Sequence, residues 1–341
     1  MTASLPPEVG RRALARADWL KIAAIAITFA GLAATLVLLG SVGLGEVLGI
    51  LARIGALRFV LYAAYTLLIL LILGIAWQVL VPGAAWTAFA WARTMREAAT
   101  NVLPFSQFGG IVVGLRVLVA SGVSQRRAYG SIIADQTAEL AAQLVFTLYG
   151  AAGLLLVLQD RSDGADLRSL ALVGLGASLA IMLAFAFAQR PMLTIAARIG
   201  GAILPGSAAA VVEVRDELDQ IYARRGRLIA CFLLHLLAWV ASGAGAAIAL
   251  AFIGFEVPLA DVLVIESLIF TLRTAAFLVP GGIGLQEGAY VLIGPLFGLP
   301  AEAALALSLA KRARDLIVDV PAMLVWQLGE VRQMLGRHSR E

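Results

Sequence analysis

The chain has 341 residues, of which 61% are hydrophobic and 14% are charged, and its mean hydropathy is +0.92. These values exclude a soluble globular protein, because that class carries more charge and fewer apolar residues. One cysteine and two histidines exclude a disulfide framework and an ordinary zinc site within one chain, so we expect no metal or other cofactor. The net charge of +4 is explained by arginine-rich loops and does not indicate a nucleic-acid partner.

Apolar stretches long enough to cross a bilayer recur along the chain. They cover residues 22–45, 59–94 with a break at Pro82 and Gly83, 140–159, 169–189 and 228–255. Their apolar residues do not alternate with polar ones, so we expect helices and not a β-barrel. The first stretch follows a basic segment, residues 1–19, and is too long for the core of a signal peptide. We therefore expect an uncleaved first span, preceded by a cytoplasmic segment.

The sequence matches itself when it is shifted by 176 residues, which indicates an internal repeat. The shift superposes pairs of proline, glycine and acidic residues, namely Pro82 and Pro258, Pro104 and Pro280, Gly122 and Gly298, and Glu139 and Asp315. We assign the two units to residues 57–158 and 228–330. Each unit is expected to contain a span, a short apolar arm, a break rich in proline and glycine, a second short arm, and a long charged helix.

The positions of the arginines predict the orientation of the two units. With the N-terminus in the cytoplasm, the arginine-rich segments near residues 126, 190–227 and 332–340 also lie there, as expected for short cytoplasmic loops. This assignment requires both broken segments, about 84–120 and about 259–298, to be re-entrant hairpins that enter from opposite sides. The chain is then an all-α polytopic membrane protein, a single domain over residues 1–341, with six full spans, two hairpins and both ends in the cytoplasm. Ten full spans would leave the ends on the same side and stay an alternative.

The second break, "FLVPGGIGLQEGAY", suggests a cavity inside the membrane. Proline and glycine leave backbone groups that lipid cannot satisfy, so such a break is stable only inside protein or beside water. The alternative is a tight loop at the membrane surface. Charged residues in the neighbouring apolar stretches favour the cavity, because each costs roughly 3 kcal/mol at the centre of a bilayer. These are Glu266, Arg273 and Glu287, beside Gly281, Gly282 and Gly284 of the break itself.

The helices that follow the two breaks carry rows of charge. Asp135 and Glu139 are four residues apart and share one helix face, and Lys311, Asp315 and Asp319 form a second row. Arg312 and Arg314 lie elsewhere on the second helix, while Arg116 lies in the first hairpin. These charges could be structural ion pairs, or they could form a proton or cation relay. We predict that they contribute to binding a polar ligand, together with the residues around the second break.

The motifs at these positions resemble a known family. "VPGGIGLQEG" followed by "SLAKRARD" is similar to the flippase-like membrane domain that includes the transmembrane part of lysylphosphatidylglycerol synthases. "LPFSQFGGIVVGLRVL" followed by "ADQTAELAAQ" resembles the hopanoid-associated HpnL-type subgroup, although "FGGIVVGLR" lacks a glutamate that many members have before the arginine. The resemblance covers residues 20–330. It implies that the chain handles a membrane lipid, with a hopanoid as the candidate, in a bacterial cytoplasmic membrane.

Three functions fit the sequence, and a lipid translocator fits best because of the inverted repeat and the charged residues at its breaks. An integral membrane lipid-headgroup transferase is the second. No phosphate loop, zinc motif or nucleophile elbow is present, and two carboxylates four residues apart are weak evidence for acid–base chemistry, so we expect no enzyme activity. The third is a scaffold for lipid-biosynthesis enzymes, which would dock on the amphipathic loop 190–227. A headgroup-facing helix explains that loop equally well. The oligomeric state is left open.

Overall fold

The computed structural model describes residue 49, residues 52–102, 106–159, 207–275 and 285–338, and scattered positions between 169 and 187. Throughout these residues the chain is helical with short connections, and it contains no strand. Three of the described helices, α3, α6 and α9, are long and apolar enough to cross a membrane. The predicted all-α membrane fold is therefore confirmed. The predicted first span, 22–45, the segment 1–19 and most of the stretch 169–189 lie outside the described residues.

The first half contains a long helix, two short helices and a second long helix. Helix α3 (Ala56–Val79) ends before Gly83, whose positive φ of 82° permits the turn into α4 (Trp86–Val102). Helix α5 (Ser106–Ala120) packs along α4, and the two occupy the predicted first hairpin. A left-handed glycine, Gly122 with φ 92°, ends α5 and leads into α6 (Gln125–Gln159).

The second half has the same order of elements. An amphipathic helix, α8 (Ser207–Ala223), precedes α9 (Arg225–Ile253), and both pack against α6. Helix α10 (Leu259–Ala275) and helix α11 (Leu285–Ile293), which continues into a 3₁₀ turn (Gly294–Phe297), occupy the predicted second hairpin. Gly298 has φ 77° and ends the turn before α12 (Ala301–His338).

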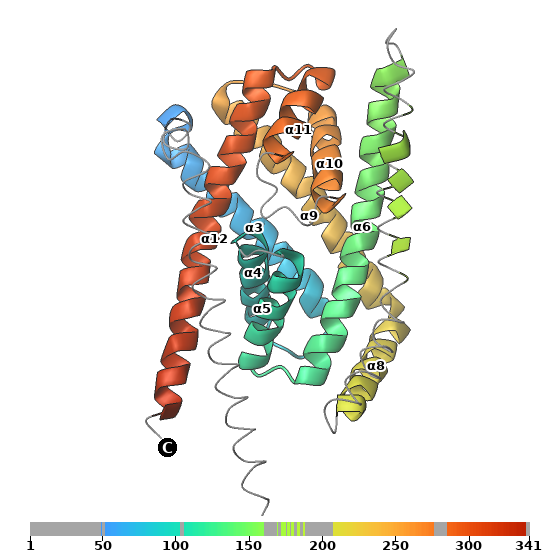
Figure 1. The fold of residues 1–341 in the computed structure, drawn as a ribbon, viewed down its shortest axis with the longest axis vertical. Helices are drawn as coiled ribbons and strands as arrows, with labels where there is room; N and C mark the ends of the chain where they lie inside the picture. Colours follow the sequence, from blue (N-terminus) through green and yellow to red (C-terminus); the bar gives the residue numbers. More distant parts are fainter. Residues whose placement is uncertain are drawn as a thin grey trace, which may run out of the picture.

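The helix bounds of the two halves match at nearly constant spacing. Helices α6 and α12 begin 176 residues apart, whereas α4 and α10 match at a spacing of 173 residues at both ends. Helices α3 and α9 pack against each other, and the Tyr65 hydroxyl of α3 donates a hydrogen bond of 2.9 Å to the Ala241 carbonyl of α9, 176 residues further along the chain. The pair α4–α5 lies toward one end of the molecule and the pair α10–α11 toward the other, which is the placement that an inverted repeat predicts (Figure 1). The return of each hairpin to its own side of the membrane stays a prediction.

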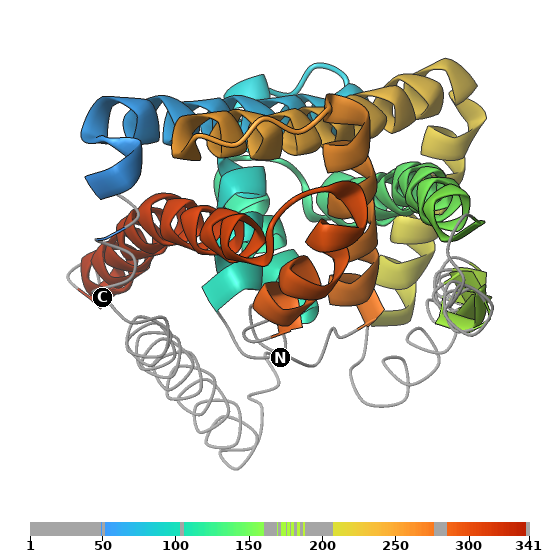
Figure 2. The ribbon, with the colours of Figure 1, turned by 90° about the horizontal axis from the view of Figure 1, so that it is seen from above.

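The two halves are packed through each other's helices. Helices α3 and α9 run side by side along one face of the molecule (Figure 2). Helix α12 packs against α4 of the first half, and α6 packs against α10 of the second half. Large apolar side chains on the outer faces of these helices, such as Leu61, Leu156 and Leu237, are exposed as expected for contact with lipid. The charged residues of α4, α6, α10 and α12 are thereby directed toward the interior.

Candidate functional site

A first group of buried charges joins α4 to α6. Arg93 binds Glu139 through two hydrogen bonds, of 2.8 and 3.0 Å, and binds Glu97 of its own helix at 3.3 Å. Arg96 lies 3.0 Å from Asp135 and 2.7 Å from Glu139. The geometry follows from helical spacing, because residues three or four positions apart lie on one face and both arginines meet both carboxylates. The four side chains form one salt-bridge network between the two helices.

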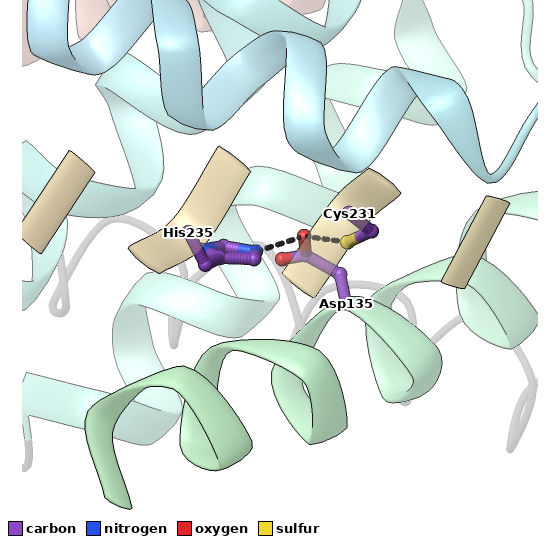
Figure 3. Close-up of side chains that lie close together, drawn as sticks. All are labelled: Asp135, Cys231 and His235. Carbon is purple, nitrogen blue, oxygen red and sulfur yellow. Dashed lines mark hydrogen bonds and ion pairs between the residues drawn. The ribbon is translucent and has the colours of Figure 1, made fainter. Parts of the chain in front are cut away.

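Helix α9 completes this first group. His235 Nε2 lies 2.8 Å from Asp135 Oδ1, and the Cys231 thiol lies 3.8 Å from the same oxygen (Figure 3). These three side chains are the one set among the described residues that could ligate a metal ion. However, the other Asp135 oxygen binds the Arg96 guanidinium, and this positive charge opposes a cation at the same carboxylate. The arrangement is better suited to holding α9 against α4 and α6.

A second group lies at the other end of the molecule, where α10, α11 and α12 meet. The Glu266 carboxylate accepts hydrogen bonds from the Tyr290 hydroxyl and from the Lys311 ammonium, and it is fully buried. Lys311 Nζ also lies 2.8 Å from the Tyr290 hydroxyl. The Phe270 ring lies 5.3 Å from the same ammonium. Three side chains from three helices thus satisfy one another in an apolar surrounding.

More accessible charges border the second group. Arg312 binds Glu287 at 3.0 Å, and Arg314 binds Asp315 at 2.5 Å and donates to the Tyr62 hydroxyl of α3 at 3.3 Å. The side chains of Glu287 and Asp315 are 20% and 19% exposed, unlike Glu266, which is 0% exposed. Arg273 is half-buried above the Phe270 ring, and its charge acts on Asp315. We call Arg273, Glu287, Arg312, Arg314 and Asp315 the border charges.

Two polar contacts join the halves between these groups. The Asn101 amide of α4 donates a hydrogen bond of 2.8 Å to the Asp319 carboxylate of α12. The Gln143 amide of α6 donates one of 2.5 Å to the Thr274 hydroxyl of α10. The charges of Glu97 and of Asp315 both act on Asp319, so the α4–α12 contact connects the first group to the border charges.

The structure distributes the predicted site residues over these groups. Asp135 and Glu139 belong to the first group, Glu266 and Lys311 to the second, and Asp319 to the contact between α4 and α12. Arg116 has an exposed side chain on α5 and belongs to neither group. The predicted Gly281, Gly282 and Gly284 lie outside the described residues. The two acidic rows do not form a relay of bare carboxylates, since Asp135, Glu139 and Asp315 each bind an arginine.

Some participants are not evident from the sequence. Arg93 and Arg96 could have been found, because two arginines three residues apart in an apolar arm need partners inside the membrane. His235 and Cys231 gave no such signal, since neither residue is unusual within a buried helix. Tyr290 follows Glu287 by three residues, yet only the packing of α11 against α10 brings its hydroxyl to Glu266.

Comparison with known proteins agrees with the sequence motifs. The model of one protein family, described as the lysylphosphatidylglycerol synthase TM region, matches residues 20–322. The comparisons with curated proteins and with solved structures find no match. The family match covers both pairs of short helices and the charge groups between them. The chain is therefore a membrane protein that belongs to the family of lysylphosphatidylglycerol synthase transmembrane regions.

Proposed function

We propose that this protein moves a lipid with a polar headgroup between the two leaflets of a bacterial cytoplasmic membrane. The observation that supports this most is the set of charged residues buried where the two halves of the chain pack together. Many transporters place their binding site at such an interface between repeats, near the middle of the membrane. A hopanoid is the candidate lipid, because the first-half motifs resemble the hopanoid-associated HpnL-type subgroup.

The border charges are the proposed headgroup site. They carry both signs and are more accessible than Glu266, so they can exchange internal contacts for contacts with a headgroup. The tail of the lipid would remain outside, along the apolar helix faces that lipid already covers. Gly281, Gly282 and Gly284 belong to the same proposal, as backbone donors and acceptors beside Glu287.

We further propose that the chain is not itself an enzyme. Asp135 and Glu139, the carboxylates considered for acid–base chemistry, are both bound by arginines. Fixed ion pairs hold both carboxylates ionised and leave neither ready to accept a proton from a substrate. Both chain ends are placed in the cytoplasm, in agreement with the distribution of arginines.

Exchange of Glu287 for glutamine tests the headgroup site. The substitution retains the shape of the side chain and removes its charge, so we expect leaflet exchange of lipid in reconstituted vesicles to fall. Loss of one charge-assisted contact, worth about 1.5–3 kcal/mol, corresponds to a decrease of about 10- to 100-fold. Glu302→Gln is the matched control, because Glu302 is an exposed carboxylate in the first turn of α12. The melting temperature of each preparation is measured in detergent.

Two outcomes would contradict the proposal. If Glu287→Gln exchanges lipid as fast as the control, or loses exchange only in proportion to lost thermal stability, Glu287 is structural. The same wild-type preparation is incubated with phosphatidylglycerol and aminoacyl-tRNA, and the lipids are analysed by mass spectrometry. We expect no new product, and a product that depends on the protein would favour the transferase.

A further inference from the structure

Asp319 differs from every other carboxylate of the charge groups. Each of the six others binds an arginine or a lysine: Glu97 and Glu139 bind Arg93, Asp135 binds Arg96, Glu266 binds Lys311, Glu287 binds Arg312, and Asp315 binds Arg314. Within the described part of the chain, Asp319 forms no ion pair, and its hydrogen-bond partner is the neutral amide of Asn101. Its side chain is nevertheless buried, with 3% of the residue exposed.

The surroundings of Asp319 do not supply the missing positive charge. On its own helix it is near Asp315 and Arg314, but Arg314 is already bound to Asp315. From α4 it is near Asn101 and Glu97, and Glu97 is a further acid. A buried carboxylate without a cation loses the solvation that water gives its charge, and two neighbouring acids add repulsion. Binding one proton removes both costs.

The matching position in the other half shows that packing does not require an ionisable group here. Gln143 precedes Asp319 by 176 residues and makes the corresponding contact between the halves, from α6 to Thr274 of α10. Thr274 follows Asn101 by 173 residues, the spacing that relates α10 to α4. One interface therefore uses a permanently neutral amide where the other uses a carboxyl group that can gain and lose a proton.

We propose that Asp319 is a reversible proton-binding site at the contact between α4 and α12. Protonated, the carboxyl group is neutral and makes a contact like that of Gln143. Deprotonated, it places an unpaired negative charge between two helices from different halves and favours their separation. Coupling of this step to lipid movement rests on the proposed function, whereas proton binding by Asp319 does not.

Infrared spectroscopy of the purified protein tests proton binding without any lipid assay. A protonated carboxyl group has a C=O stretching band that is separate from those of carboxylates and shifts in D₂O. We expect this band near neutral pH in the wild type, its loss in Asp319→Asn, and its retention in Glu302→Gln. Asp319→Gln, which copies the residue at the matching position, serves if the asparagine variant does not fold. Absence of the band from the wild type, or its persistence in both Asp319 variants, would overturn the proposal.

Vesicles with an imposed pH gradient then test coupling. We expect lipid exchange by the wild type to respond to the gradient, and Asp319→Asn to lose that response while the control keeps it. If the wild type moves no lipid at all, the proposed function fails, and the infrared band still decides the proton site. If exchange occurs but ignores the gradient, the coupling is wrong and only the proton site stands.

Discussion

At the scale of single residues, the charges inside this protein are tolerated because almost all of them are paired. An isolated charge at the centre of a membrane costs roughly 3 kcal/mol on insertion scales. Arg93, Arg96, Asp135 and Glu139 offset this cost together, since each guanidinium meets a carboxylate at 3.0 Å or less. Removal of one member leaves a buried charge uncompensated, which is more damaging than the loss of the bond itself.

Asp135→Asn should therefore destabilise the protein strongly. Asp135 binds both Arg96 and His235, so its neutralisation weakens the contact of α6 with α4 and with α9. We expect a loss of about 3–5 kcal/mol in the free energy of unfolding, seen as a lower melting temperature in detergent. Arg126→Gln is the control, because Arg126 binds Glu217 at the surface with 45% of its side chain exposed. Its effect should be about 1 kcal/mol or less, and equal effects of the two variants would contradict this account.

At the scale of helices, small residues allow close packing. Apolar helices in lipid gain little from the hydrophobic effect, so they associate through close contact at glycine and alanine. Gly74 of α3 faces the backbone of α4, and a Cβ at this position would lie 2.6 Å from Ala90 Cα. Gly150 of α6 similarly faces Ser267 of α10, across the interface of the two halves.

Gly74→Ala should separate α3 from α4 and lower the melting temperature. The added methyl group meets backbone atoms that cannot rotate away, and overpacking of this kind typically costs about 1–3 kcal/mol. Gly329→Ala in α12 is the matched control, because a Cβ at Gly329 has no atom within 4 Å. The control should be neutral or slightly stabilising, since alanine favours a helix more than glycine does. An unchanged melting temperature for Gly74→Ala would show that α3 and α4 are less tightly packed.

At the scale of the whole molecule, the two halves are interlocked. The long helix of each half packs on a short helix of the other, α12 on α4 and α6 on α10. Movement of one half against the other must therefore change both contacts, Asn101 with Asp319 and Gln143 with Thr274. Helix positions at the two ends of the molecule decide which contact faces which side of the membrane.

The predicted orientation can be measured by labelling single cysteines in intact cells. Cys231 is buried and is replaced by alanine to give a background without thiols. Arg53→Cys and Arg215→Cys introduce thiols at exposed positions. An impermeant maleimide should label position 53 from outside and position 215 only after the membrane is opened, because the arginine distribution places residue 215 in the cytoplasm. Labelling of both from the same side would disprove the inverted arrangement.

The sequence by itself determined the class of protein, the family and the order of elements. Composition and long apolar stretches are enough for the membrane assignment, because lipid excludes unpaired backbone and charge. The proline and glycine residues at matching positions placed both pairs of short helices, since these residues end helices through local backbone geometry. Helical spacing also placed Asp135 beside Glu139, as a local property of one helix.

Only the tertiary structure decided which charges meet. Asp135 is separated from His235 by 100 residues and from Arg96 by 39, and Asn101 is separated from Asp319 by 218. Such pairs depend on how each helix is rotated about its axis and on which neighbour it packs against, and local periodicity specifies neither. For the same reason, Asp319 and Asp315 look alike in the sequence, on one face of one helix. Packing gives Asp315 an arginine and leaves Asp319 with a neutral amide.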